Sequence, residues 1–263
     1  MTVYSISFIG AGNLAGSLCM ELFRNGYKIN HIISETGISA AALAQKCSAS
    51  WSTKLSIPYN TDLVIVAIPD KSLDDVLRRV TCDHDVIIAH TAGSHGLEVF
   101  ENRFQHRGVI YPLQTFTEGR MVDFKEVPFF IEASDSFTAT LLESIAKQVG
   151  KSVHYADLES RQMLHISAVF INNFTNHILA QGKEIAERAG FSFEEMIPLL
   201  NETLKKAIEI GPGKAQTGPA VRHDINTIDK HLELLSFSPE LRKIYAEISN
   251  SIIKRHHNLN GKF

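Results

Sequence analysis

The chain has little of what builds disulfide frameworks or metal centres. It holds only three cysteines, Cys19, Cys47 and Cys82, an odd number without metal-ligand spacing. None of its 12 histidines falls into a His-Glu-x-x-His or comparable pattern. Structural and catalytic metal sites need such spacings, and disulfide frameworks need paired cysteines. We therefore expect no metal site and interpret the cysteines as packing thiols.

The sequence also lacks a basic excess and a long apolar run. A formal net charge of −3 gives no positive field of the kind that attracts nucleic acid or anionic membranes. No apolar run approaches the length of a membrane span, and a predicted strand follows Met1 closely, where a secretory signal would be charged and then apolar. We expect a cytoplasmic protein whose partner is a small molecule, with neither nucleic acid nor membrane as a partner.

What the chain does contain is enough apolar material for two packed units. It has 263 residues, of which 44% are hydrophobic, and this length favours two domains. In its first part, short β-branched runs alternate with helical stretches, the pattern of a parallel sheet with helices on both faces. The expected strands are residues 5–9, 29–34, 63–68, 86–89, 109–111, 129–132 and 152–155. The expected helices are residues 14–24, 40–47, 73–80, 97–104 and 138–148.

After Asp157 the β signal disappears. Residues 158–189 are predicted to form one long helix, followed by three amphipathic helices at residues 193–210, 224–235 and 239–253. Residues 258–263 are expected to form a disordered tail. The predicted fold is therefore α/β, with a doubly wound, mostly parallel sheet in residues 1–156 and an all-helical domain in residues 157–263.

A glycine-rich turn joins the first predicted strand to the first predicted helix. Gly10 permits a tight turn, Gly12 lets a backbone approach a pyrophosphate, and Ala15 is small enough for close packing of helix on sheet. The free N–H groups of the first helical turn, which contains Asn13 and Leu14, would face the phosphates together with the positive end of the helix dipole. Strand, turn and helix come in the order that a dinucleotide site requires, so this segment predicts one.

Polar or small residues follow several predicted strands, where open parallel sheets bind ligands. These segments are Ile68-Pro69-Asp70-Lys71-Ser72, His90-Thr91-Ala92-Gly93-Ser94 and Pro112-Leu113-Gln114-Thr115-Phe116. Asp70 or Ser72 could equally cap the next helix. His90 could hydrogen-bond a substrate or nicotinamide, or transfer a proton, but it could also be a structural link to a neighbouring loop. Gly93 could bring a backbone close to a nicotinamide ring or be an ordinary turn glycine.

The long predicted helix carries a polar stripe of His165, Asn172 and Asn176 beside an apolar face. Buried polar groups need partners, which a substrate, the facing domain or a twin helix in a dimer could supply. We assign His165 and Asn172 to an active-site cleft and favour structural pairing for Asn176.

A third polar cluster lies between two predicted helices. Asp224 with Thr227 is typical of a helix N-terminus, so capping is its default role. Thr217 and Arg222 remain candidates for ligand contact, because an arginine can hold a carboxylate or phosphate in a fixed fork.

Five motifs together resemble one family. They are Gly10-x-Gly12-x-x-Ala15, His90-Thr91-Ala92-Gly93, Tyr111-Pro112-Leu113-Gln114-Thr115-Phe116, Asn172-Asn173-Phe174-x-Asn176-His177 and Thr217-Gly218-Pro219-Ala220-x-Arg222-x-Asp224. The chain resembles the Rossmann-like proteins with a DUF2520 C-terminal domain, which are described as NADP-dependent oxidoreductases and are similar in layout to pyrroline-5-carboxylate reductase and, more distantly, ketopantoate reductase. The resemblance implies a Rossmann-like cofactor domain that binds NADP and a helical domain through which a homodimer forms.

One departure from the family pattern concerns the cofactor. Where NADP-binding relatives commonly have Ser-Arg-Thr or Asn-Arg-Ser at the end of the second strand, this chain has Ser34-Glu35-Thr36. Glu35 would repel a ribose 2′-phosphate but could accept hydrogen bonds from a free 2′-hydroxyl. It could instead point into solvent while Ser34 and Thr36 contact a phosphate. NADP by resemblance and NAD by local chemistry both stay open.

The leading hypothesis is an oxidoreductase that transfers a hydride between NAD(P)H and a small C=O or C=N substrate in the interdomain cleft. The alternative is a dinucleotide-binding sensor or scaffold without turnover, because no acid and base with a distinctive catalytic spacing is visible.

The candidate catalytic residues are His90, His165 and Asn172. The candidate cofactor-binding residues are Gly10, Gly12, Asn13, Leu14, Ser34, Glu35, Thr36, Ile68, Pro69, His90, Thr91, Ala92 and Gly93. The candidate substrate-binding residues are Gln114, Asn172, Asn176, Thr217 and Arg222.

Overall fold

The computed structural model describes residues 4–260, with side chains through residue 256. It divides into two compact units, Met1–Asn173 and Phe174–Phe263, each of which is described by itself. The second unit therefore begins later than the helical domain expected at residue 157, and that domain boundary stays a prediction.

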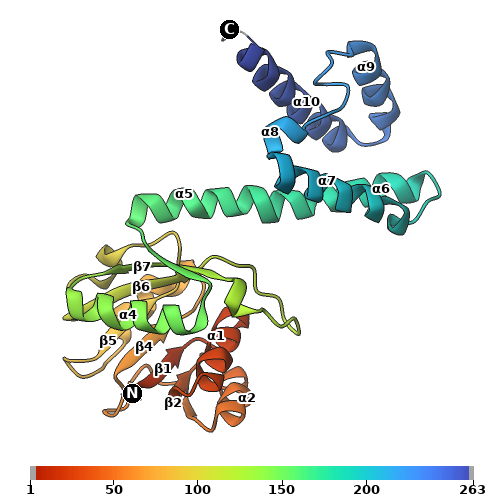
Figure 1. Cartoon of the computed structure of the whole chain (residues 1–263). Coiled ribbons are helices and arrows are strands. Elements are labelled where there is room, and N and C mark those ends of the chain that lie inside the picture. The colour runs from red at the N-terminus through yellow and green to blue at the C-terminus, as the bar shows by residue number, and fades with distance from the viewer. Residues whose placement is uncertain (1–3, 261–263) are drawn as a thin grey trace. The chain divides into compact units, whose positions relative to one another are not determined.

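The first unit is built on an eight-stranded sheet (Figure 1). Its strands are β1 (Ser5–Ile9), β2 (Lys28–Ile33), β3 (Ser50–Ser52), β4 (Leu63–Val66), β5 (Ile87–His90), β6 (His106–Pro112), β7 (Pro128–Ala133) and β8 (Ser152–Tyr155). They lie in the order β3-β2-β1-β4-β5-β6-β7-β8, so the chain winds outward from β1 in one direction and then in the other. Every neighbouring pair is parallel except β6 and β7, which are antiparallel. The predicted doubly wound, mostly parallel fold is confirmed.

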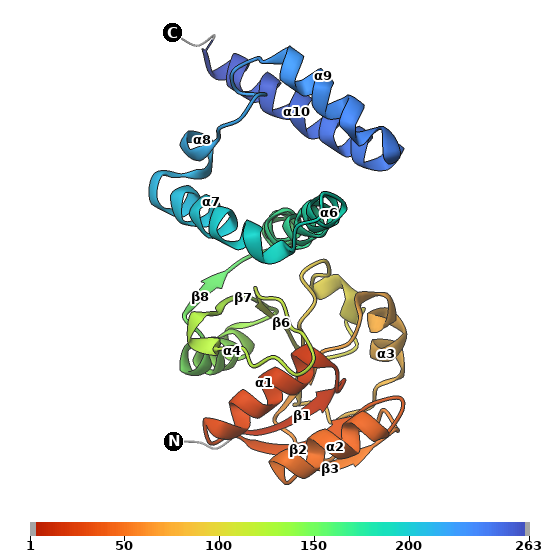
Figure 2. The ribbon, with the colours of Figure 1, turned by 90° about the vertical axis from the view of Figure 1, so that its right-hand side faces the viewer.

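Helices cover both faces of this sheet. The helices of this unit are α1 (Asn13–Arg24), α2 (Ile38–Cys47), η1 (Asp70–Ser72), α3 (Leu73–Arg79), η2 (Leu97–Phe100), η3 (Phe124–Glu126), α4 (Ser136–Val149), α5 (Leu158–Ala168) and the π-helical η4 (Val169–Phe174), which ends at the first residue of the second unit. Those that cover the two faces include α1, α2 and α4 on one side and α3 and η2 on the other. Within β4, Leu63 and Ile65 join the core shared with α1, α2 and α4, whereas Val64 and Val66 join the core shared with α3 and η2. Figure 2 shows α3 on the opposite side of the sheet from α4. Burial on both faces explains why the central strands are continuous apolar runs.

Two predictions for the first unit were wrong in detail. The helix expected at residues 97–104 is only the short 3₁₀ turn η2, because Glu101 and Asn102 adopt positive φ angles of 48° and 57° that end it. Its apolar residues still pack on the sheet, which accounts for the helix-like spacing. The short strand β3 was not expected, because its sequence, Ser-Trp-Ser, carries little β signal and it only extends the edge of the sheet beyond β2.

In the described part of the second unit, every regular element is a helix. The unit contains α6 (Thr175–Arg188), η5 (Phe193–Met196), α7 (Ile197–Ile210), α8 (Pro212–Ala215), α9 (Ile225–Leu234), η6 (Leu235–Phe237) and α10 (Pro239–Asn260). The His231 ring on α9 is joined to the Tyr245 hydroxyl on α10 by a 2.7 Å hydrogen bond. Because α10 continues to Asn260, the tail expected at residues 258–263 begins as helix, and residues 261–263 lie outside the described residues. Among the helices described here, none is long and apolar enough to cross a membrane.

Candidate functional site

The turn between β1 and α1 depends on Gly10. Its φ of +111° is one that side chains rarely allow, and a Cβ at this position would lie 2.1 Å from the carbonyl oxygen of Ala67. The Gly10 N–H donates a 2.8 Å hydrogen bond to the carbonyl of Ile33 at the end of β2. Because Gly10 has no side chain, the turn can pass close to the ends of both β2 and β4.

The N-terminus of α1 is open to a ligand. Gly12 is its N-cap, no side chain caps the helix, and no acidic residue occupies its first turn. A Cβ on Gly12 would meet nothing within 4 Å. The amide hydrogens of the first turn thus have no intrahelical partner, and with the helix dipole they suit a diphosphate. These features fit the phosphates of a dinucleotide.

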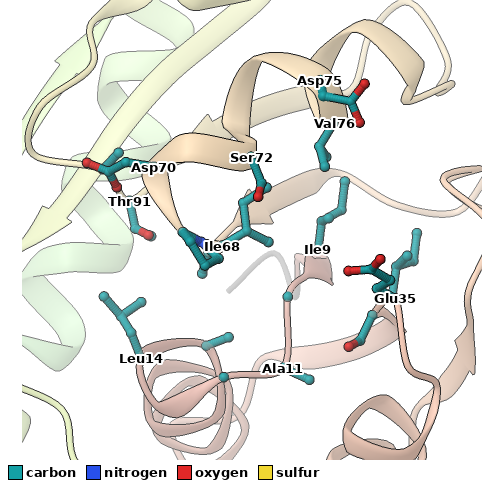
Figure 3. Close-up of a pocket in the computed structure, with 18 of the residues that line it drawn as sticks. Ile9, Ala11, Leu14, Glu35, Ile68, Asp70, Ser72, Asp75, Val76 and Thr91 are labelled. Carbon is teal, nitrogen blue, oxygen red and sulfur yellow. The ribbon is translucent and has the colours of Figure 1, made fainter.

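A cavity of about 710 Å³ adjoins this turn, at the carboxyl ends of the central strands (Figure 3). Its position flanks β1, from which the strand order runs in both directions, the usual ligand site of such sheets. The volume is typical of a cofactor or small-molecule site. The predicted cofactor residues that line it are Gly10, Gly12, Asn13, Leu14, Ser34, Glu35, Ile68, Pro69, Thr91, Ala92 and Gly93.

His90 and Thr36, also predicted to bind cofactor, are not among the residues that line the cavity. His90 is fully buried: its Nδ1 accepts a 3.2 Å hydrogen bond from the Ala92 N–H, so its Nε2 donates to the Gly96 carbonyl at 3.2 Å. Burial lowers the pKa of this imidazole to about 4, which keeps it neutral near pH 7. His90 therefore has the geometry of the structural link to a neighbouring loop, and we give it no part in proton transfer. The Thr36 hydroxyl lies 3.4 Å from that of Ser39, within its own turn.

A tyrosine and a histidine meet at the cavity wall. The Tyr111 hydroxyl, at the end of β6, lies 3.3 Å from Nδ1 of His165 on α5, and both side chains line the cavity. Burial and, secondarily, the charge of Asp70 raise the pKa of Tyr111, so its phenol stays protonated at neutral pH. A Cβ on Gly93 would lie 2.8 Å from the Tyr111 ring, so this glycine makes room for the tyrosine. The sequence analysis quoted Tyr111 within a family motif but not as a site residue, although its position at a strand's carboxyl end could have singled it out.

Asp70 stands near this pair. The Ser94 hydroxyl donates to its carboxylate and lies 2.9 Å from Nδ1 of His95, which itself lies 3.9 Å from the Asp70 carboxylate. Ser72, the N-cap of α3, makes no side-chain capping hydrogen bond. Asp70 thus ties the loop after β4 to the loop after β5, in a position that faces the cavity.

The charged side chains of the cavity are mostly acidic. The described lining includes the carboxylates of Glu35, Asp70 and Asp75 and a single cationic side chain, that of Arg79. Arg79 is paired with Asp75 at 2.8 Å. Nothing in the sequence marked these two helix residues, because only the tertiary fold brings α3 to the cavity. No cluster of three or more His, Cys, Asp or Glu that could hold a metal occurs among the described residues.

Of the predicted substrate residues, Gln114 and Asn172 belong to the first unit, and neither lines the cavity. Gln114 is exposed, and its side-chain oxygen accepts a 2.8 Å hydrogen bond from the Thr115 N–H. Asn172 is exposed in η4, where its amide lies 3.4 Å from that of Asn173. The remaining three are exposed residues of the second unit, Asn176, Thr217 and Arg222. Their roles, like that of Asn172, stay predictions.

The predicted capping role of Asp224 is confirmed. Its carboxylate accepts a 3.1 Å hydrogen bond from the Thr227 N–H at the start of α9 and a 2.8 Å bond from the Thr227 hydroxyl.

Two family models match the chain. Residues 5–93 match the family described as NADP oxidoreductase, coenzyme F420-dependent, and residues 127–252 match a domain of unknown function, DUF2520. Among proteins of curated function, none matches this sequence.

Solved structures extend the comparison over the whole chain. A Bacteroides fragilis protein, provisionally named an NADP oxidoreductase, is 41% identical, with 95% of this chain and 98% of that one covered and a TM-score of 0.87. A pyrroline-5-carboxylate reductase from Coxiella burnetii is 17% identical, with 98% and 99% covered and a TM-score of 0.58. A reductive aminase from Aspergillus terreus, solved with NADPH and ethyl-5-oxohexanoate, is 14% identical, with 97% and 95% covered and a TM-score of 0.70. The last two share the fold. The chain belongs to the family of Rossmann-like proteins in which an NADP oxidoreductase domain precedes a DUF2520 domain.

Proposed function

We propose that this protein is an oxidoreductase that transfers a hydride between NAD(P)H and a small C=O or C=N compound. One observation carries the proposal: a single cavity has both the open N-terminus of α1 and the Tyr111–His165 pair in its lining. The first is a binding site for phosphates, and the second is a protonated acid with a hydrogen-bonded neighbour. Membership of an NADP oxidoreductase family supports the same reading.

In this proposal the first-turn amides of α1 would hold the cofactor's diphosphate, and Thr91 and Ala92 after β5, which line the same cavity, would adjoin its nicotinamide. The bound nicotinamide supplies the hydride to a substrate carbon. Tyr111 donates its phenolic proton to the substrate oxygen or nitrogen, and His165 passes a replacement proton to the phenol. His165 suits that task because it is exposed and its Nδ1 lies within reach of the Tyr111 hydroxyl.

Two features favour different cofactors, one NADP and the other NAD. The family is NADP-dependent, and the aminase of the same fold was solved with NADPH. Glu35, however, lines the cavity just after β2, where a carboxylate accepts hydrogen bonds from a free ribose 2′-hydroxyl. Either nucleotide is therefore a substrate of the proposed reaction, and their relative affinities need measurement.

We also propose that the protein acts in the cytoplasm as a homodimer formed through its helical domain. The support is apolar surface on the helices of the second unit, where Leu199 is 66% exposed and Ile208 is 84% exposed. Sedimentation velocity should give a dimer mass, and an Ile208→Glu variant should shift the protein toward monomer. A wild-type monomer at micromolar concentration would contradict this assembly.

The function itself is tested in two steps. Purified protein is titrated with NADH and NADPH by cofactor fluorescence, and then a panel of small keto acids and cyclic imines is screened for oxidation of the nucleotide that binds. Binding followed by oxidation with at least one compound is the expected result. Binding without oxidation across the panel would favour the sensor or scaffold, and no binding at millimolar nucleotide would end the redox interpretation.

A further inference from the structure

One end of the cavity is formed by segments that follow the outer strands and by α3. Ser34 and Glu35 follow β2, Thr53 follows β3, and Asp75 and Arg79 belong to α3. Figure 3 shows Asp75 and Glu35 toward one end of the cavity and Asp70 and Thr91 toward the other. Because the residue after the second strand meets the ribose of the adenosine in this fold, the end with Glu35 is the adenosine end.

Arg79 is the one cation in the described lining of this cavity. It lies one helical turn after Asp75, and the two side chains form a 2.8 Å ion pair. Both are largely exposed, at 66% and 69% of their side-chain surface. An exposed pair of this kind contributes little to stability, so the guanidinium can leave Asp75 for a stronger partner without disturbing the fold.

A phosphate monoester is such a partner. The guanidinium presents its N–H groups as a planar fork that fits phosphate oxygens, and hydrogen bonds between two charged groups are the strong ones. The segment after β2 offers no such group, because Glu35 is there and its charge opposes a phosphate. Among the described residues that line this cavity, the cation available to an additional phosphate on the adenosine ribose is therefore Arg79 on α3.

We propose that Arg79 binds the 2′-phosphate of NADP(H) from α3, in place of an arginine after β2, and that Asp75 competes for it. This inference rests on the proposed function, since it assumes that the cavity holds a nicotinamide dinucleotide. It assigns to α3 the discrimination between the two cofactors.

The test measures dissociation constants of NADPH and NADH by fluorescence at one fixed ionic strength, on the full chain. Arg79→Gln should weaken NADPH about 10- to 100-fold, the loss expected for a charged hydrogen bond, and change NADH less than about threefold. Arg78→Gln is the matched control: Arg78 is the adjacent arginine on α3, but it pairs with Glu101 at 2.7 Å and does not line the cavity. That control should leave both constants unchanged.

Asp75→Asn supplies an independent measurement. Freed from its competitor, Arg79 should bind NADPH severalfold more tightly, with little change for NADH. In a double-mutant cycle, most of this gain should vanish when Arg79 is also replaced, because the two substitutions act through one contact.

An unchanged ratio of NADPH to NADH affinity in Arg79→Gln would overturn the inference, whether both constants moved together or neither moved. A parallel loss for both nucleotides would mean that Arg79 meets the adenine or the diphosphate instead. Wild-type protein that binds NADH but not NADPH would overturn it while leaving the proposed function intact. Wild-type protein that binds neither nucleotide would overturn the proposed function and the inference with it.

Discussion

The guanidinium of Arg161 on α5 is completely buried and donates a 2.6 Å hydrogen bond to the carboxylate of Glu132 in β7. The same guanidinium donates to the carbonyls of Ala156, at 2.6 Å, and His95, at 2.8 Å. It thereby connects the start of α5, which carries His165, to the loop after β5. A buried charge is tolerated only when it is paired, so this contact stabilises the geometry around the Tyr111–His165 pair.

Removing the acidic partner should destabilise the first unit. Glu132→Ala would leave the Arg161 charge buried without its counter-ion, and we expect the free energy of unfolding to fall by about 3 kcal/mol. Glu132→Gln keeps an acceptor and should cost less. Urea unfolding measures both, with Glu126→Ala as control, because Glu126 pairs with Lys151 at the surface and should cost under about 1 kcal/mol. Equal losses for Glu132→Ala and Glu126→Ala would contradict this reading.

Gly12 should be needed for binding and not for folding. A Cβ there meets no atom within 4 Å, so Gly12→Ala should unfold at nearly the wild-type temperature. The added methyl would stand where the diphosphate approaches the amides of α1, and we expect both NADH and NADPH to bind at least about tenfold more weakly. Gly182→Ala is the control, since it has equal space but lies in α6. Wild-type affinity in Gly12→Ala would place the phosphates elsewhere.

Loss of the phenol should slow turnover without affecting the cofactor. Tyr111→Phe removes the proposed proton donor, and we expect kcat to fall about 10²- to 10⁴-fold, the usual contribution of general acid catalysis. His165→Ala should lower kcat to a smaller extent, because water can replace a relay. Nucleotide dissociation constants should stay within about threefold in both, and Tyr59→Phe, which changes a tyrosine that is 89% exposed, should match wild type. Unchanged kcat in Tyr111→Phe would remove the tyrosine from the mechanism.

Reversing the charge at Glu35 should change the cofactor preference. Glu35→Arg places a cation just after β2, at the adenosine end, so the NADPH-to-NADH affinity ratio should rise by about tenfold or more. Glu35→Gln should produce a smaller rise, because it removes repulsion without adding attraction. Fluorescence titration of both nucleotides gives the ratio, and a wild-type ratio in Glu35→Arg would show that this side chain does not face the ribose.

His90 should make stability depend on pH. Its pKa is about 4 in the folded protein, below the ordinary value of 6.5, because burial disfavours the charged ring. The unfolded chain therefore binds the extra proton between these two values. The free energy of unfolding should fall by about 3 kcal/mol as the pH drops from 7 to 4. Well above pH 6.5 the ring is neutral in both the folded and the unfolded chain, so this loss of stability should be absent there.

Urea unfolding between pH 4 and 7 isolates this contribution by comparison with His90→Gln, which should lack it. His84→Gln, at an exposed histidine, should retain the wild-type slope. Parallel pH profiles for wild type and His90→Gln would show that the ring titrates normally.

Local sequence patterns predicted most elements because their signals are strong. The run 63–68 is almost wholly apolar, and β4 occupies its first four residues, buried on both faces. The spacing of Leu97, Phe100 and Phe104 indicated a helix, but it reflects one-sided packing on the sheet around a 3₁₀ turn. For β3 the pairing with β2 decides the conformation, and a sequence window of three residues holds no trace of it.

The candidate site, too, has a part that the sequence could predict and a part that it could not. Gly10, Gly12 and the helix after them were predictable, because phosphate binding at a strand-turn-helix junction depends on residues adjacent in the chain. His90 was a candidate by position, yet its role depended on whether its ring nitrogens faced the cavity or the loop at residues 91–96. The structure turns both of them toward that loop.

By itself, then, the sequence determined the order of strands and helices, the glycine turn before α1 and the change to an all-helical C-terminal part, because each follows from residues near one another in the chain. Only the tertiary structure decided that Tyr111 meets His165, that Arg161 is buried against Glu132, and that Asp75 and Arg79 border the cavity. Those contacts join residues of separate elements, and their distances depend on how helices pack on the sheet, which no local pattern encodes.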